Sequence, residues 1–199
     1  MSQNVSSNRN LLSIGFIILV VVLAIFSYTQ YNRLVKLDTE VDAQWAQVQN
    51  VLQRRADLIP NLVNTVQGFA GQEQSVYGDI AQARSRLLSA RTPEEVNAAA
   101  PTFESALGRL LVLTENYPEL RSSQLFTQLL DELAGTENRI AVERQRYNEK
   151  VRDYNLAARR LPVAWVVPAL GLDRQKAFFE AREGSEQPPT VDFNTQPRR

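Results

Sequence analysis

The chain has 199 residues and a net charge of zero, because 22 lysines and arginines balance 22 aspartates and glutamates, and it contains no histidine and no cysteine. The missing histidines exclude a Ser-His-Asp triad, an imidazole base and di-iron bundles of the Glu-x-x-His type. The missing cysteines exclude thiolate nucleophiles, disulfides, structural zinc clusters and iron–sulfur sites. Without a basic stripe or a glycine-rich phosphate loop, the sequence predicts no nucleic-acid partner, no metal site and no cofactor.

An uncharged apolar segment near the N-terminus is the first predicted element. Residues 10–32 carry no charged side chain, and residues 11–26 are almost all aliphatic. A helix over residues 11–30 would cross a bilayer core about 30 Å thick, since each residue adds about 1.5 Å. We therefore predict an N-terminal tail over residues 1–10 and a transmembrane anchor over residues 11–30. The anchor residues include Leu11, Phe16, Val20, Phe26 and Tyr28.

A cleaved signal peptide is the alternative interpretation of this segment. Cleavage needs small residues in a small-x-small pattern. Ala24-Ile25-Phe26 breaks that pattern, so an uncleaved anchor is favoured. A buried soluble helix is disfavoured because it would rarely lack polar residues all round.

Residues after the anchor show helical spacing, with apolar positions at intervals of three and four and few glycines or prolines before Leu161. The first apolar stripe runs from Tyr31 to Leu87. Pro60 interrupts it and either kinks one helix or ends it near Leu58. The apolar phase continues past Pro60, so we predict a single kinked helix over residues 32–89.

A chain reversal is predicted near residues 90–93, where Thr92 can cap a helix, Pro93 can begin it and Glu95 can complete a capping box. The helix that follows weakens at Tyr117. A third and more regular stripe runs from Phe126 to Leu161. A short helix over residues 173–182 and an irregular tail over residues 184–199 are predicted to follow.

These elements predict an all-α protein. An N-terminal transmembrane helix would be followed by an elongated antiparallel helical bundle over residues 31–183, with three long helices and a short C-terminal one.

Three polar residues lie inside the apolar stripes: Asp38, Arg55 and Glu143. They form a buried polar network that fixes the register of the helices, or they reach water because the stripe drifts. If the first and third long helices are antiparallel neighbours, Arg55 would pair with Glu137 or Glu143. The available partners for Asp38 would then be Arg139 and Arg146.

The segment Leu161–Leu172 is apolar, far too short to span a membrane, and contains two prolines. We predict that it contacts the membrane surface or a partner through Trp165, Val166 and Leu170, since tryptophan favours the headgroup region. The alternative is that the segment caps the core of the bundle.

Several sequence blocks closely resemble the LemA family. The blocks are YNRLVKL (31–37), QRRADLIPNLVNTVQGFA (53–70), ENYPEL (115–120), TENRIAVERQRYNEKVRDYN (136–155) and PPTVDF (188–193). The resemblance implies a bacterial inner-membrane protein with a single N-terminal membrane helix and an antiparallel helical bundle. The family has no established catalytic residues, so none is carried over. Its members are often encoded beside a membrane metalloprotease or a TPM-domain protein, and a related magnetosome protein is implicated in membrane shaping.

Two functional classes are consistent with this sequence. The first is a membrane-bound scaffold that forms homo-oligomers or shapes the bilayer. The second is an accessory subunit that docks a membrane protease or a TPM-domain partner. An enzyme is disfavoured because the usual acid–base and metal-binding residues are missing.

The orientation of the bundle follows from weak and opposing signals. Arg9 precedes the anchor, whereas Arg33 and Lys36 follow it, and this excess slightly favours a cytoplasmic bundle. The cysteine-free domain and the family resemblance favour the extracytoplasmic side, which is the expected location.

Overall fold

The structure is a computed structural model that describes residues 4–71, 73–161 and 163–180; the side chains of residues 4–13, 166, 169 and 170 lie outside the description. The regular structure of the described residues is entirely helical, so the predicted all-α class is confirmed. The helices are α1 (Asn4–Gln67), α2 (Gln74–Ser89), α3 (Pro93–Thr114), α4 (Pro118–Arg121), α5 (Gln124–Ala158), α6 (Val163–Val166) and the 3₁₀ turn η1 (Val167–Leu170).

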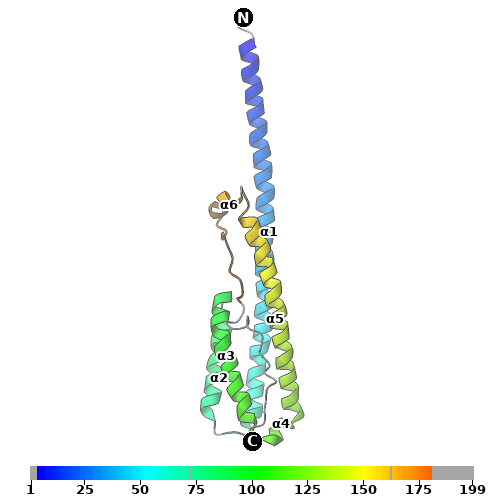
Figure 1. Cartoon of the computed structure of the whole chain (residues 1–199), viewed down its shortest axis with the longest axis vertical. Coiled ribbons are helices and arrows are strands. Elements are labelled where there is room, and N and C mark those ends of the chain that lie inside the picture. The colour runs from blue at the N-terminus through cyan, green and yellow to red at the C-terminus, as the bar shows by residue number, and fades with distance from the viewer. Residues whose placement is uncertain (1–3, 72, 162, 181–199) are drawn as a thin grey trace, which may run out of the picture.

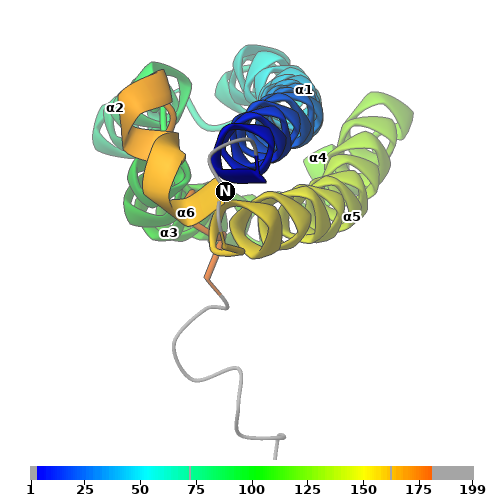
Figure 2. The same cartoon turned by 90° about the horizontal axis from the view of Figure 1, so that it is seen from above.

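Four helices form an elongated up-and-down bundle, and α1 projects far beyond it at one end (Figure 1). The chain descends along α1, returns along α2, descends along α3 and returns along α5. Seen from above, α1 and α5 form one side of the bundle, with α2 and α3 opposite them (Figure 2). The most extensive packing is between α1 and α5, followed by α2 with α3.

The predicted single helix over residues 32–89 is wrong, because α1 ends at Gln67 and the chain reverses before α2 begins at Gln74. Gly68 and Gly71 lie in this turn, and the Tyr77 hydroxyl donates a hydrogen bond to the Ala70 carbonyl at 2.7 Å. The apolar stripe passes through the turn without losing its phase because both helices bury it in the same core. Buried positions on either side include Leu62, Val66, Ala70, Tyr77 and Ile80.

Pro60 does not end α1, in agreement with the continuous apolar phase. Proline lacks the N–H that would bond the carbonyl four residues earlier, which is that of Ala56. That carbonyl instead accepts a hydrogen bond from Arg84 Nε at 2.7 Å. Arg84 also pairs with Asp57 at 3.2 Å. A side chain of α2 therefore satisfies the backbone group that the proline leaves without a partner.

The predicted reversal near residues 90–93 is confirmed. Thr92 caps α3 by accepting a hydrogen bond from the Glu95 N–H at 3.2 Å. The Glu95 carboxylate in turn accepts a hydrogen bond from the Arg91 N–H at 2.6 Å. Two backbone donors at the helix start are satisfied in this way, but the carboxylate bonds the residue before the cap and not the Thr92 N–H that a standard capping box uses.

The predicted helix over residues 173–182 is also wrong for the part that the structure describes. Residues 173–180, which we call the strap, are non-helical and are hydrogen-bonded to side chains of α5. They lie antiparallel to α5, because Lys176 is bonded to Asn155 and Phe179 is bonded to Asn148. The side chains of Asn155 and Asn148 hold the strap in this extended conformation by bonding its backbone groups.

Candidate functional site

The apolar anchor is the outward-projecting part of α1. Its described side chains from Ile14 to Thr29 are all exposed. Ile14–Gln67 contains an uncharged window with a mean hydropathy of 2.1, and it is the one described helix long and apolar enough to cross a membrane. Four of the predicted anchor residues are solvent-exposed, namely Phe16, Val20, Phe26 and Tyr28. The side chain of Leu11 lies outside the described part of the structure.

The serine and threonine hydroxyl groups between Ile14 and Thr29 have hydrogen-bond partners within the helix. Ser27 Oγ donates to the Leu23 carbonyl and Thr29 Oγ1 donates to the Phe26 carbonyl, each at 2.8 Å. Hydrocarbon cannot provide such partners, and an unsatisfied polar group there costs several kcal/mol. The segment is therefore compatible with an apolar surrounding along its length.

Arg55 lies at the centre of an ion-paired cluster between three helices. Its side chain on α1 is 8% exposed and contacts Glu104 of α3 at 2.6 Å and Glu137 of α5 at 2.5 Å. The guanidinium also lies over the Phe103 ring, 5.2 Å from its centroid. Glu137 was among the expected partners, whereas Glu104 was not predicted. This cluster joins α3 to the α1–α5 pair.

Glu143 does not pair with Arg55. It accepts a hydrogen bond from Gln44 of α1 at 2.6 Å and pairs with Arg146 at 2.8 Å. Because Glu143 lies six residues after Glu137 on α5, the Arg55 side chain reaches only the earlier acid.

Asp38 pairs with Lys176 of the strap at 2.9 Å, so the expected partners Arg139 and Arg146 were wrong. Asp42 lies 3.8 Å from the same Lys176 amino group. Burial disfavours the charged form of Lys176, but the hydrogen bond and charge of Asp38 outweigh it and raise the pKa of Lys176. This ion pair ties the strap to α1.

Two asparagines of α5 hold the backbone of the strap. The Asn155 side chain accepts a hydrogen bond from the Lys176 N–H at 2.8 Å and donates one to the Lys176 carbonyl at 3.0 Å. Asn148 does the same for Phe179, with both distances at 2.9 Å. Seven residues of helix rise about 10.5 Å, and three extended residues span about 10 Å. The spacing of the two asparagines thus matches an extended chain.

An aromatic cluster completes the attachment of the strap. The Phe179 ring stacks on Trp45 of α1 at 5.8 Å and meets Tyr147 of α5 edge-on at 5.2 Å. The Tyr154 hydroxyl donates to the Asp173 carbonyl at 2.7 Å. Burial, reinforced by nearby carboxylates, raises the pKa of Tyr147 and of Tyr154 to about 12. Both hydroxyls therefore stay neutral over the physiological range.

The segment around Trp165 lies at the anchor end of the bundle, where α6 stands beside α1 (Figure 1). Val163 and Val167 are buried, whereas Trp165 is 74% exposed. Of the predicted contact residues, Val166 and Leu170 have side chains outside the described part.

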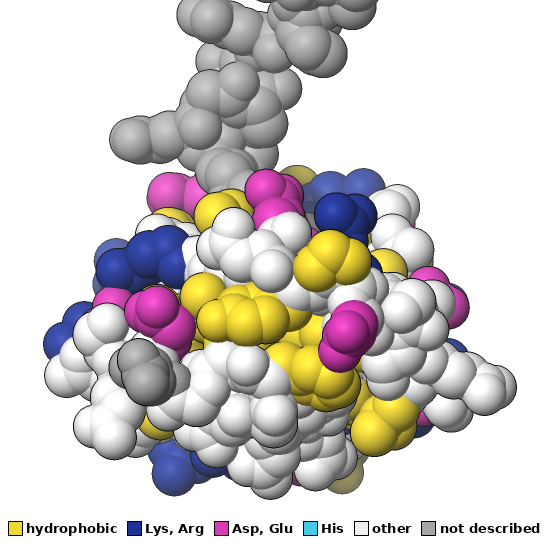
Figure 3. Space-filling view, turned by 90° about the horizontal axis from the view of Figure 1, so that it is seen from below, with side chains coloured by type: hydrophobic (Ala, Val, Ile, Leu, Met, Phe, Trp, Pro, Cys, Tyr) yellow, Lys and Arg dark blue, Asp and Glu magenta, His cyan; other side chains and the backbone are white. Residues whose placement is uncertain are grey.

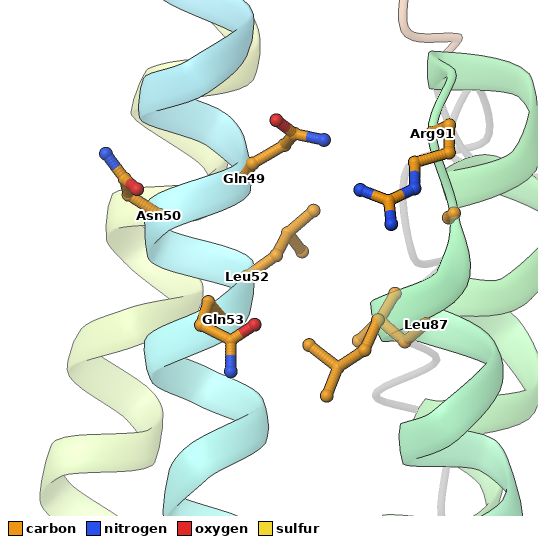
Figure 4. Close-up of a pocket in the computed structure, with 8 residues that line it drawn as sticks. Gln49, Asn50, Leu52, Gln53, Leu87 and Arg91 are labelled. Atoms are coloured by element: carbon orange, nitrogen blue, oxygen red, sulfur yellow. The ribbon is translucent and has the colours of Figure 1, made fainter.

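The described surface is shallow and mixed in charge. One depression of about 240 Å³ lies between α1 and the α2–α3 turn; Leu52 and Leu87 face each other across it and Arg91 lies at its edge (Figure 4). At the end away from the anchor, apolar side chains lie among acidic and basic ones (Figure 3). No group of three or more acidic, histidine or cysteine side chains that could hold a metal occurs among the described residues.

Comparison with known proteins gives the following matches. The family model described as LemA family matches residues 44–193. The magnetosome protein MamQ of Magnetospirillum gryphiswaldense is 24% identical over 181 aligned residues, covering 78% of this chain and 66% of the relative. Protein LemA of Metamycoplasma hominis is 25% identical over 145 residues, covering 70% of this chain and 65% of the relative. The chain thus spans just under two thirds of the length of these relatives.

Proposed function

The chain belongs to the LemA family, and we propose that it acts as a membrane-anchored, non-catalytic helical scaffold that self-associates and organises or shapes the membrane. The observation that carries this proposal is the continuity of α1. A single helix, Asn4–Gln67, contains the exposed apolar anchor and then becomes the principal core helix of the bundle. The bundle is therefore a direct extension of the anchor.

The charged side chains inside the bundle support a structural role. Arg55 joins three helices through Glu104 and Glu137, and Lys176 joins the strap to Asp38. These groups are engaged with one another, so they hold the helices in register instead of facing a substrate cavity. The relatives named as magnetosome proteins also support a role in organising a cellular structure.

The mass of the detergent-solubilised full-length particle tests self-association. A scaffold is expected to purify as a homo-oligomer whose mass, after correction for bound detergent, is a multiple of 22.5 kDa. A monomer that recovers one stoichiometric membrane partner would instead support an accessory subunit that docks a protease or a TPM-domain protein. A monomer without any partner would contradict both roles.

Single cysteines can map the contact between copies, because the chain has none of its own. Leu125→Cys and Leu156→Cys place a thiol near either end of α5, where the native side chains are 57% and 52% exposed. Val151→Cys is the matched control on the same helix, since Val151 is 0% exposed. In native membranes, an exposed position at the interface should give crosslinked dimers, whereas the buried control should not.

We propose that the anchor crosses a bacterial inner membrane once and that the bundle lies on the extracytoplasmic side. The Leu125→Cys variant tests the orientation as well, since this residue lies at the end of α5 away from the anchor. Treatment of spheroplasts with a membrane-impermeant maleimide should label it before lysis. Labelling only after lysis would place the bundle in the cytoplasm.

A further inference from the structure

The last turns of α5 lie against α1 directly after the anchor. Arg33 and Leu37 of α1 line a surface depression of about 210 Å³ together with Asp153, Leu156 and Ala157 of α5 and with Arg160, which follows α5. Every described side chain from Ile14 to Thr29 is exposed, and the first buried one among the described side chains of α1 is Leu34. The bundle therefore begins within about two helical turns of the end of the anchor.

The α6–η1 segment is fixed to this end of the bundle with its tryptophan directed outward. Val163 and Val167 are 5% and 0% exposed, and Trp165 between them is 74% exposed. Residues four apart on a helix share a face, whereas the residue midway between them points the other way. Burial of the two valines therefore forces the Trp165 indole to the outside.

Further apolar and basic side chains are exposed at this end of the bundle. Leu156 and Leu161 are 52% and 65% exposed, and Tyr31 is 41% exposed. Arg33 and Arg160 are exposed as well, and neither has an ion-pair partner among the residues that the structure describes. We call these residues the membrane-end surface. Such a combination of aromatic, aliphatic and cationic side chains is what the bilayer interface favours.

We propose that the membrane-end surface rests on the headgroup layer of the bilayer that holds the anchor, with the Trp165 indole at headgroup depth and Arg33 and Arg160 facing anionic phospholipid phosphates. Of the described helices, α1 alone extends far beyond α6 at this end of the molecule (Figure 1). Because α1 enters the bilayer there, the nearest large apolar phase is the membrane itself. This proposal deepens the proposed scaffold role, since a second contact would fix how the bundle leans and faces on the membrane.

Fluorescence of Trp165 in vesicles tests the contact. The full-length Trp45→Phe variant leaves Trp165 as the single tryptophan, because the chain has two. It is reconstituted into phosphatidylcholine vesicles that carry bromine on the acyl chains near the glycerol backbone. The Trp165 emission should be shifted to the blue and quenched by the brominated lipid.

The matched control carries its only tryptophan at the opposite end of the bundle. The triple variant Trp45→Phe, Trp165→Phe, Leu125→Trp places an indole at a position that is natively 57% exposed. Quenching at position 165 should be several-fold stronger than at position 125. Equal quenching at the two positions would overturn the proposal, and so would protection of Trp165 from an aqueous quencher without quenching by lipid, which would indicate a protein contact.

A second measurement keeps the test valid if the Trp45→Phe variant does not fold. Trp165→Cys and Leu125→Cys each provide a unique thiol for a nitroxide spin label, and Trp45 is retained. The label at position 165 should be more accessible to oxygen, which concentrates in lipid, than to a water-soluble nickel complex. The opposite order at position 165 would overturn the proposal.

A comparison of anionic with neutral vesicles tests the role of Arg33 and Arg160. Vesicles that contain phosphatidylglycerol should increase lipid quenching of Trp165 relative to neutral vesicles, because an anionic surface attracts nearby basic side chains. The Arg33→Gln, Arg160→Gln double variant should lose this increase, and added salt should reduce it. An increase that the variant retains would overturn the role of the two arginines. Since none of these measurements depends on particle mass, their failure is distinguishable from the failure of the scaffold role.

Discussion

The α1–α5 pair runs the length of the bundle and is covered by different structures in its two halves, the near half next to the anchor and the far half away from it. In the far half, α2 and α3 cover the pair, and the buried side chains are mainly aliphatic, with Arg55 linking three helices. In the near half the strap takes this place and is held by Asn148, Asn155 and an aromatic cluster. A helical hairpin buries more surface, whereas an extended segment needs specific hydrogen bonds to stay in place.

The largest expected difference between the halves is in the free energy of unfolding that is lost when one buried phenylalanine in each half is replaced by alanine. Phe103→Ala removes a side chain of α3 that is 0% exposed and should lower the global free energy of unfolding by about 3–5 kcal/mol. Phe179→Ala should lower the global free energy of unfolding by less. The strap can open locally while the rest of the bundle stays folded, so the loss cannot exceed the free energy with which the strap is docked. Chemical denaturation of the solubilised chain and hydrogen exchange at Lys176 measure the two effects. Equal global losses would show that the strap and the hairpin unfold as one unit.

The next largest effect concerns the charged cluster of the far half. Arg55→Met leaves Glu104 without its partner and should cost about 2–3 kcal/mol, below the range for a fully buried pair because Glu137 is 53% exposed. Adding Glu104→Leu should recover part of this loss.

Arg109→Met is the matched control for the charged cluster, because it breaks the Arg109–Asp79 pair, whose side chains are 57% and 46% exposed. It should cost less than about 1 kcal/mol. Small and additive losses for Arg55→Met and Glu104→Leu would show that the cluster contributes no specific coupling.

A smaller effect is expected from the asparagines of the near half. Asn148→Ala and Asn155→Ala each remove two hydrogen bonds to the strap and should weaken its docking by about 1–2 kcal/mol. Asn155→Asp is the conservative comparison, since it can still accept from the Lys176 N–H but cannot donate to the Lys176 carbonyl. Hydrogen exchange should show faster exchange at strap amides and unchanged exchange in α2 and α3. Equal acceleration in the hairpin would contradict local opening.

The last comparison requires no substitution, only alkaline solution. Burial raises the pKa of Tyr147 and Tyr154 to about 12 in the folded chain, against about 10 when unfolded. Between these values the unfolded chain binds fewer protons, so stability falls as the pH rises from about 10 to about 12 and is fully present below about 10. Because both rings contact the strap or its neighbours, the near half should open first. Tyr154→Phe should reduce the slope of stability against pH in this range.

The two halves also differ in how far the sequence predicts them. The apolar spacing of α1 and α5 and the capping residues at Thr92 indicated the helices of the far half and one of its turns. The turn before α2 was missed because the stripe keeps its phase across Gly68 and Gly71. Two glycines so close together were the available signal.

The strap had no periodic signal in the sequence. It is held by side-chain amides that bond backbone groups, and such contacts impose no pattern on the strap residues themselves. Asn148 and Asn155 stand seven residues apart on α5, one half-buried and the other buried, and this spacing was the only hint. Arg55 was recognisable as a charge within a stripe, but its partner Glu104 depended on the register of α3, which α2 sets after the missed turn.

The absence of a hinge in α1 has a mechanical consequence. Because the helix is continuous from Asn4 to Gln67, any lean of the anchor in the bilayer is transmitted undiminished to the far end of the bundle. Residues 31–67 rise about 55 Å, and a typical tilt of about 20° would sweep the tip sideways by about 19 Å. Where the membrane curves convexly toward the bundles, the outer ends of neighbouring copies would lie farther apart than their anchors. Where it curves concavely, the outer ends would lie closer together. In the proposed scaffold, a rigid α1 would therefore relate local membrane curvature to the spacing of the outer ends of the molecules.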